Sequence, residues 1–126
     1  MRRIAAVLSV LAVFAAGCAS DEAATVLNPQ QTVSFLEDNP DAILIDVRTP
    51  AEVAEGFLAG AVMLDALDPS FVANAQTLDP NATYVVYCRS GNRSAAAIEV
   101  LQDLGFTTLY DAGAFTALAN AGIPTG

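Results

Sequence analysis

Two short apolar runs constrain the fold of this chain more than any other feature. They are AILID at residues 42–46 and TYVVY at residues 83–87. Neither run alternates between apolar and polar residues, as a strand with one solvent-exposed face would. Continuous apolar runs of this length are typical of parallel strands that are covered on both faces. The sequence therefore predicts a sheet buried between two layers of helices.

Helix signals lie between the apolar runs. The pairs NP at 28–29 and TP at 49–50 each place a capping side chain before a proline at the first helical position. Asp68 and Ser94 are the expected N-caps of the third and fourth helices. This alternation indicates an α/β fold, with one domain at residues 24–126, a mostly parallel sheet of about five strands, and helices on both faces. We expect strands at 24–27, 42–46, 60–64, 83–87 and 107–110, and helices at 28–39, 49–56, 68–78, 94–105 and 114–122.

Residues 1–17 have the layout of a secretory signal. Two arginines precede an apolar stretch at 4–16, which small residues follow. The stretch is too short to span a bilayer, which takes about 20 residues. The ending AAGC resembles the lipobox of bacterial lipoproteins, which implies that Cys18 carries a lipid and that residues 18–23 form a short tether. The alternative is a short anchor helix or a buried helix. We expect an exported protein that is lipid-anchored to a bacterial membrane on its extracytoplasmic side.

The charge of the chain excludes several classes of function. It has 14 acidic residues against 5 basic ones, and no histidine. Such a surface repels phosphate backbones, so nucleic acid is not an expected partner. A metal site built from histidine or from a thiolate cluster is excluded too, because one cysteine remains once Cys18 is assigned to a lipid. Beyond the signal segment the basic residues are Arg48, Arg89 and Arg93, so each is expected to have a specific role.

The segment CRSGNRS at residues 88–94, called the cysteine loop below, follows the second apolar run and precedes a helix. Gly91 and Asn92 both tolerate left-handed backbone angles, so the chain can curl there. A curled loop that runs into a helix points several N–H groups inward and binds anions. A Cys88 thiolate at its centre would be favoured over the thiol. The alternative that the residues leave open is a buried, inert Cys88 beside solvated arginines.

The residues around the cysteine loop support a nucleophilic thiolate. Arg89 and Arg93 add positive charge for the thiolate or for an anionic substrate. No histidine exists to act as a base, so activation would come from the loop itself. Asp46 and Arg48 stand at the end of the first apolar run. Because ligands bind outside the carboxyl ends of parallel strands, this pair is expected at the same edge of the sheet as Cys88.

Three segments resemble the rhodanese superfamily: LIDVRTPAEVAEG, CRSGNRSA and LGFTTLYDAGAFTALANAGIP. The second is the most specific, and the resemblance runs over nearly the whole of the predicted domain. It implies sulfur transfer, in which Cys88 takes the outer sulfur of thiosulfate or a similar small anionic donor as a persulfide and passes it to cyanide or a thiol. No metal or organic cofactor would be needed. The resemblance also implies that Asp46 and Arg48 support the site, and that the persulfide is held by the backbone N–H groups of Arg89, Ser90, Gly91, Asn92, Arg93 and Ser94.

The length of the cysteine loop separates two chemistries within this superfamily. Members with four residues between Cys and Arg generally transfer sulfur, and members with five act on phosphate or arsenate. Here Arg93 follows Cys88 after four residues, so phosphatase or arsenate reductase activity is the lesser alternative. Another alternative is a persulfide carrier, or a partner-binding module without turnover. We expect a monomer.

The chain departs from the family pattern in three places. Phe57 and Ala59 stand where His and Pro are usual, Gly113–Ala114 stands where the family has two glycines, and Leu118 replaces a tryptophan. These positions shape the turn and the packing near the site, so they bear on substrate preference and rate. They leave the chemistry of the cysteine intact.

Overall fold

The structure is a computed structural model, and it describes residues 24–126. The predicted signal, the tether and Cys18 lie outside the described residues. Five strands form one sheet in the order β1-β5-β4-β2-β3, and every pair of neighbours is parallel. The strands are β1 (Thr25–Val26), β2 (Ile43–Asp46), β3 (Val62–Met63), β4 (Thr83–Cys88) and β5 (Thr108–Ala114). The helices are α1 (Pro29–Asp38), α2 (Pro50–Val53), α3 (Phe71–Ala75), α4 (Asn92–Asp103) and α5 (Phe115–Asn120).

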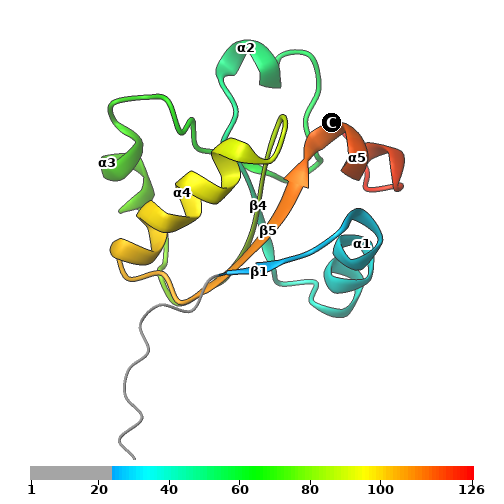
Figure 1. Cartoon of the computed structure of the whole chain (residues 1–126), viewed down its shortest axis with the longest axis horizontal. Coiled ribbons are helices and arrows are strands. Elements are labelled where there is room, and N and C mark those ends of the chain that lie inside the picture. Colours follow the sequence, from blue (N-terminus) through cyan, green and yellow to red (C-terminus); the bar gives the residue numbers. More distant parts are fainter. Residues whose placement is uncertain (1–23) are drawn as a thin grey trace, which may run out of the picture.

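Helices cover both faces of the sheet, which confirms the predicted α/β architecture. In Figure 1, α3 and α4 lie on one side of the strands, and α1 and α5 lie on the other. Neighbouring residues of β4 point to opposite faces, so Val86 packs in the layer that contains Leu101 of α4, and Val85 packs in the layer that contains Leu118 of α5. This explains why the run at 83–87 does not alternate between apolar and polar residues. Within residues 24–126, no helix is both long and apolar enough to cross a membrane.

The two predicted proline-led helices begin where their capping signals stand. Asn28 Oδ1 accepts the Gln31 N–H at 2.8 Å, and Gln31 Oε1 accepts the Asn28 N–H at 2.9 Å. Thr49 Oγ1 accepts the Glu52 N–H at 3.3 Å, and Glu52 Oε1 accepts the Thr49 N–H at 3.0 Å. Both are reciprocal capping boxes, which satisfy backbone donors that the first turn of a helix leaves unpaired.

The third helix is shorter than predicted, and Asp68 is not its N-cap. Asp68 Oδ1 accepts the Ser70 N–H at 2.8 Å, which closes a turn before the helix. The helix then starts at Phe71, with Ser70 in the cap position and without a side-chain cap. A short acidic side chain that bonds to the backbone two residues on favours such a turn over continued helix.

The last strand is longer than predicted, because it does not end at residue 110 and runs on to Ala114. Its register against β4 shifts by one residue, since Val86 pairs with Asp111 while Tyr87 pairs with Gly113. The residue between, Ala112, is the extra residue of a β-bulge. The bulge lies after Asp111 and keeps β5 paired with β4 up to Cys88, while Asp111 itself stays in the regular register opposite Val86.

Candidate functional site

The two neighbourhoods singled out in the sequence meet at one edge of the sheet, as predicted. Strands β2 and β4 are parallel neighbours, and Asp46 pairs with Tyr87 in the register. Cys88 is the last residue of β4, so it lies at the carboxyl end of the strands together with Asp46. Ligands of open parallel sheets bind at this edge.

Cys88 is fully buried, at 0% exposure, at the base of the cysteine loop. Its Sγ accepts a hydrogen bond from the Gly91 N–H at 2.8 Å. We expected several inward N–H groups at the sulfur; among the described residues, that of Gly91 is the backbone N–H that bonds to it. The side chain of Ser94 also lies beside the sulfur, with Oγ 3.6 Å from Sγ. Ser90 and Asn92 are exposed on the outside of the loop.

The cysteine loop turns into helix α4 earlier than predicted. Gly91 has a φ of +98° and is the N-cap, and Asn92 is already helical. The prediction that Ser94 caps the helix is therefore wrong. The left-handed angle of Gly91 alone makes the turn from the strand, so the next residue is already helical. Ser94 then sits in the first turn and points its hydroxyl inward, at 2.8 Å from Asp111 Oδ1 and 3.0 Å from the Gly91 carbonyl oxygen.

The start of α4 favours negative charge on the sulfur. No side chain caps this 12-residue helix, so the N–H groups of its first turn are not used by a cap. The positive end of the helix dipole therefore faces the region of Cys88. Arg93 adds positive charge to the same region. Its hydrogen bonds to Glu52 raise its pKa most, and the nearby Cys88 raises it further.

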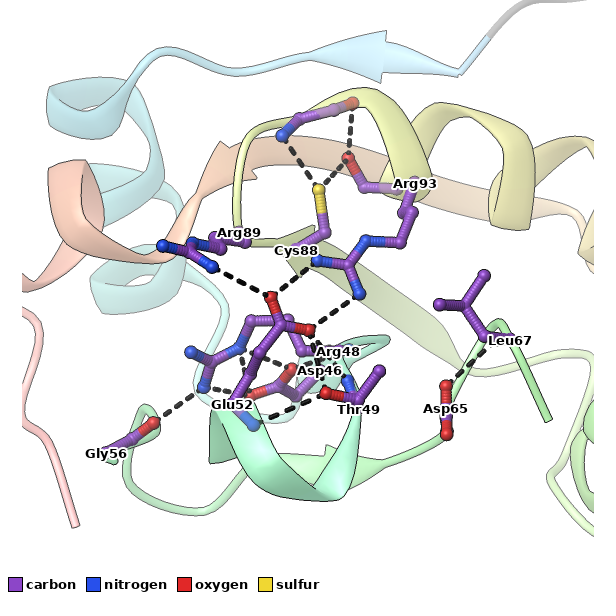
Figure 2. Close-up of polar contacts among 12 residues, drawn as sticks. Asp46, Arg48, Thr49, Glu52, Gly56, Asp65, Leu67, Cys88, Arg89 and Arg93 are labelled. Carbon is purple, nitrogen blue, oxygen red and sulfur yellow. Dashed lines mark hydrogen bonds and ion pairs between the residues drawn. The ribbon is translucent and has the colours of Figure 1, made fainter. Parts of the chain in front are cut away.

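The two arginines of the cysteine loop both point at Glu52 of α2 (Figure 2). Arg93 Nη1 and Nη2 donate to Glu52 Oε1 and Oε2, each at 2.7 Å. Arg89 Nη1 lies 3.8 Å from Glu52 Oε2, and this side chain is 75% exposed. The bonds from Arg93, followed by the bond from the Thr49 N–H, lower the pKa of Glu52 from 4.5 to about 2. Arg93 is therefore a fixed part of the site, whereas Arg89 extends into solvent.

Asp46 and Arg48 form a buried structural pair, as the resemblance implied. Arg48 Nε and Nη2 donate to the Asp46 carboxylate at 2.7–3.1 Å, and Nη2 also donates to the Gly56 carbonyl oxygen at 2.6 Å. The Tyr87 hydroxyl donates to Asp46 Oδ2 at 2.7 Å. The Arg48 guanidinium also stacks on Phe115, with Cζ 4.2 Å from the ring centroid.

Comparison with known proteins places these features in a family. The model of the rhodanese-like domain matches residues 28–120. The chain belongs to the rhodanese-like domain family. A sulfurtransferase of Allochromatium vinosum is 35% identical over 71% of this chain and 82% of that protein. The thiosulfate sulfurtransferase PspE of Escherichia coli is 31% identical over 60% of this chain and 72% of that protein.

Two solved structures agree with the assignment of the fold. A rhodanese-related protein of Thermoplasma volcanium superposes with a TM-score of 0.68 at 25% identity, over 81% of this chain and 97% of that one. The rhodanese-like domain of an Anabaena protein superposes with a TM-score of 0.71 at 23% identity, over 84% of this chain and 80% of that one.

The departures of this rhodanese-like domain from the family pattern differ in burial, since Leu118 is buried, Phe57 is half-buried and Ala59 is exposed. The backbone of Phe57 accepts the Gly126 N–H at 2.8 Å, and the Ala59 N–H donates to the Pro124 carbonyl oxygen at 2.8 Å. Leu118 is fully buried under the second face of the sheet. The turn at residues 56–61 is thus fastened to the C-terminal tail of the domain.

Three functional contacts of this rhodanese-like domain were missed from the sequence. Glu52 completes the capping box of α2, and it also binds Arg93. Tyr87 was expected as a core residue, and its hydroxyl joins Asp46 to the Leu58 N–H, from which it accepts at 3.0 Å. Asp111 was not singled out. A usable signal was present for Asp111, because it directly follows the predicted last strand at 107–110, and a carboxylate after a strand end lies at the ligand edge.

Proposed function

We propose that this chain is a rhodanese-type sulfurtransferase that moves sulfane sulfur through a persulfide on Cys88. The donor is thiosulfate or a similar small sulfane compound, and the acceptor is cyanide or a thiol. The proposal is a two-step exchange, in which the enzyme holds the sulfur between the steps.

The environment of the Cys88 sulfur carries the proposal. The sulfur lies at the end of β4, accepts the Gly91 N–H at 2.8 Å, and faces the uncapped start of α4. Both features stabilise an anionic sulfur, and Arg93 adds a fixed positive charge nearby. A thiolate in such a setting is a nucleophile, whereas an inert core cysteine would have an apolar surround.

The size of the cysteine loop supports sulfur over phosphate. Four residues separate Cys88 from Arg93, and the fork of Arg93 is occupied by Glu52. A tetrahedral oxyanion needs a wider ring of N–H groups and a free arginine fork. The relatives named as sulfurtransferases support the same choice of chemistry.

The two steps balance without a cofactor. A lone pair of the Cys88 sulfur bonds to the outer sulfur of the donor, the S–S bond of the donor breaks, and its electron pair leaves with the rest of the donor. A lone pair of the acceptor then bonds to the outer sulfur, and the electron pair of the persulfide bond returns to Cys88. Arg89 is exposed at the mouth of the loop, so it meets an anionic donor on approach.

Mass spectrometry of the purified chain after addition of thiosulfate tests the proposal. We expect a gain of one sulfur atom on the peptide that contains Cys88, its loss on addition of cyanide with formation of thiocyanate, and no gain in Cys88→Ala. Absence of the gain with thiosulfate and with other sulfane donors contradicts the proposal. A gain without onward transfer to cyanide or thiols indicates a persulfide carrier instead.

We also propose where this enzyme works. The signal-like segment and Cys18 support export and a lipid anchor on the extracytoplasmic side of a bacterial membrane. The acidic charge of the chain supports small molecules and not nucleic acid as partners, and the enzyme acts as a monomer. Fractionation of cells that express Cys18→Ala tests the anchor, since the variant should leave the membrane fraction or remain unprocessed. Unchanged attachment contradicts lipidation.

A further inference from the structure

The Cys88 thiol has no exposed surface in this structure at which it could pass its proton directly to bulk water. Both Cys88 and Ser94 are 0% exposed. The chain contains no histidine and no lysine, so the usual bases for a cysteine nucleophile are missing from the sequence. A buried thiol that attacks a donor must nevertheless pass its proton to a hydrogen-bonded neighbour.

A chain of hydrogen bonds leads from the sulfur to a carboxylate. The Cys88 thiol lies 3.6 Å from Ser94 Oγ, and Ser94 Oγ lies 2.8 Å from Asp111 Oδ1. The hydroxyl has one hydrogen and can accept another, so it can receive the thiol hydrogen while it donates to the carboxylate. Its other acceptor is the Gly91 carbonyl oxygen, at the longer distance of 3.0 Å. The Gly113 N–H donates to the same Asp111 oxygen at 3.1 Å and holds the carboxylate in place.

Asp111 links this chain of hydrogen bonds to a cavity beside α4. It is half-buried, and it lines a cavity of about 210 Å³ between α4 and the strands β1 and β5, together with Ala95, Ile98 and Glu99. The cavity is therefore a place where a proton can leave Asp111 without passing the donor site. Asp111 forms no ion pair with any residue between 24 and 126, so no neighbouring cation fixes its charge.

We infer that Asp111, acting through Ser94, is the proton acceptor for Cys88. The inference rests on the proposed sulfur transfer. As the sulfur attacks, the S–H proton passes to Ser94 Oγ, and the hydroxyl proton of Ser94 passes to Asp111. The electron pair of the S–H bond stays on sulfur and forms the new S–S bond. Asp111 then releases the proton to water in the cavity, so no oxidant or reductant is needed.

Charged groups near this chain of hydrogen bonds come from two elements, α4 and α2. Glu99 of α4 shares the cavity with Asp111. Arg93, also of α4, is held by Glu52 of α2, on the side of the loop that faces α2. Glu99 has the same charge as Asp111 but no hydrogen bond to Ser94, and this makes it the matched control.

The test uses the full chain with substitutions at Asp111. In Asp111→Asn the amide oxygen still accepts from Ser94 and Gly113, but the amide takes no proton. We expect both thiosulfate:cyanide turnover and the alkylation of Cys88 by iodoacetamide, followed on the Cys88 peptide, to slow by about tenfold or more near neutral pH. Asp111→Ala should be equally slow and should recover with added formate, a carboxylate small enough for the cavity. Glu99→Gln should keep both rates.

The outcomes separate this inference from the proposed function. If no donor gives a persulfide, the proposed function fails, and the alkylation measurement still decides the role of Asp111. Alkylation and turnover in Asp111→Asn within about twofold of the original chain, or faster, overturn the proton route, because a general base contributes more than this. Slow Asp111→Ala without recovery in formate overturns it too and indicates a structural role. Thermal unfolding of each variant identifies any that has lost its fold.

Discussion

Glu52 and Arg93 stand 41 residues apart in the sequence and form a two-pronged ion pair, with both bonds at 2.7 Å. Glu52 belongs to the first turn of α2, and Arg93 belongs to the first turn of α4. The pair therefore links the cysteine loop to α2, in the segment that connects β2 to β3. The same carboxylate also completes the capping box of α2 at Thr49, so a single side chain serves both elements.

Removing the charge of Glu52 should loosen the cysteine loop. We expect Glu52→Gln to lower the free energy of unfolding by about 1 kcal/mol, the upper end for partly exposed ion pairs, because the side chains are 17% and 24% exposed. The amide can still accept from Thr49, so the capping box should persist. Urea unfolding at neutral pH measures the change. Glu55→Gln, an exposed position of the same segment, is the control and should change little; equal losses in both variants would contradict the prediction.

The contribution of Glu52 to the free energy of unfolding should decrease as the pH falls. Its pKa is lowered from 4.5 to about 2 in the folded protein, first by the bonds from Arg93. A carboxyl whose pKa is depressed on folding stabilises the protein above its ordinary pKa and loses this contribution as the pH falls toward the folded value. The difference in unfolding free energy between the original chain and Glu52→Gln should thus be constant from pH 7 to about 5 and shrink from about 4.5 toward 2. A difference that grows on acidification would be incompatible with this sign.

The buried hydroxyl of Tyr87 should contribute measurably to the free energy of unfolding. Burial raises the pKa of Tyr87, so the group stays protonated and donates to Asp46 while it accepts from the Leu58 N–H. Tyr87→Phe leaves both partners without this bond in a buried place, which should lower the free energy of unfolding by about 1–3 kcal/mol. Chemical unfolding checks this value. Tyr110→Phe, a half-buried tyrosine that packs on Phe35, is the control and should lose clearly less.

Gly91 should be intolerant of a side chain for a conformational reason. Its φ of +98° is strained for residues with a Cβ, whereas a Cβ there would meet nothing closer than Gly113 Cα at 3.8 Å. We expect Gly91→Ala to cost about 1–2 kcal/mol of stability through the backbone and to reduce sulfur transfer, because the Gly91 N–H would turn away from Sγ. Gly91→Asn should retain more of both, since asparagine tolerates left-handed angles better. Equal effects of both substitutions would point to lost space instead of strain.

Local patterns in the sequence were enough for the element order and for the identity of the key loop. The apolar runs before Asp46 and Cys88 predict buried parallel strands, and the capping signals at Asn28 and Thr49 mark helix starts, because both depend on residues within a few positions of each other. The ends of elements were less predictable. The start of α4 depends on the angle that Gly91 adopts, and several angles are open to a glycine.

The sequence by itself determined that Cys88 ends a buried strand, that a loop of four residues leads to Arg93, and that no histidine can serve the thiol. Tertiary structure decided which partners the loop has. Only the pairing of β2 with β4 brings Glu52 to Arg93, and only the pairing of β4 with β5 brings Asp111 to Ser94. Such contacts join residues far apart in the chain, and their free energy depends on strand order and register, which no local pattern encodes.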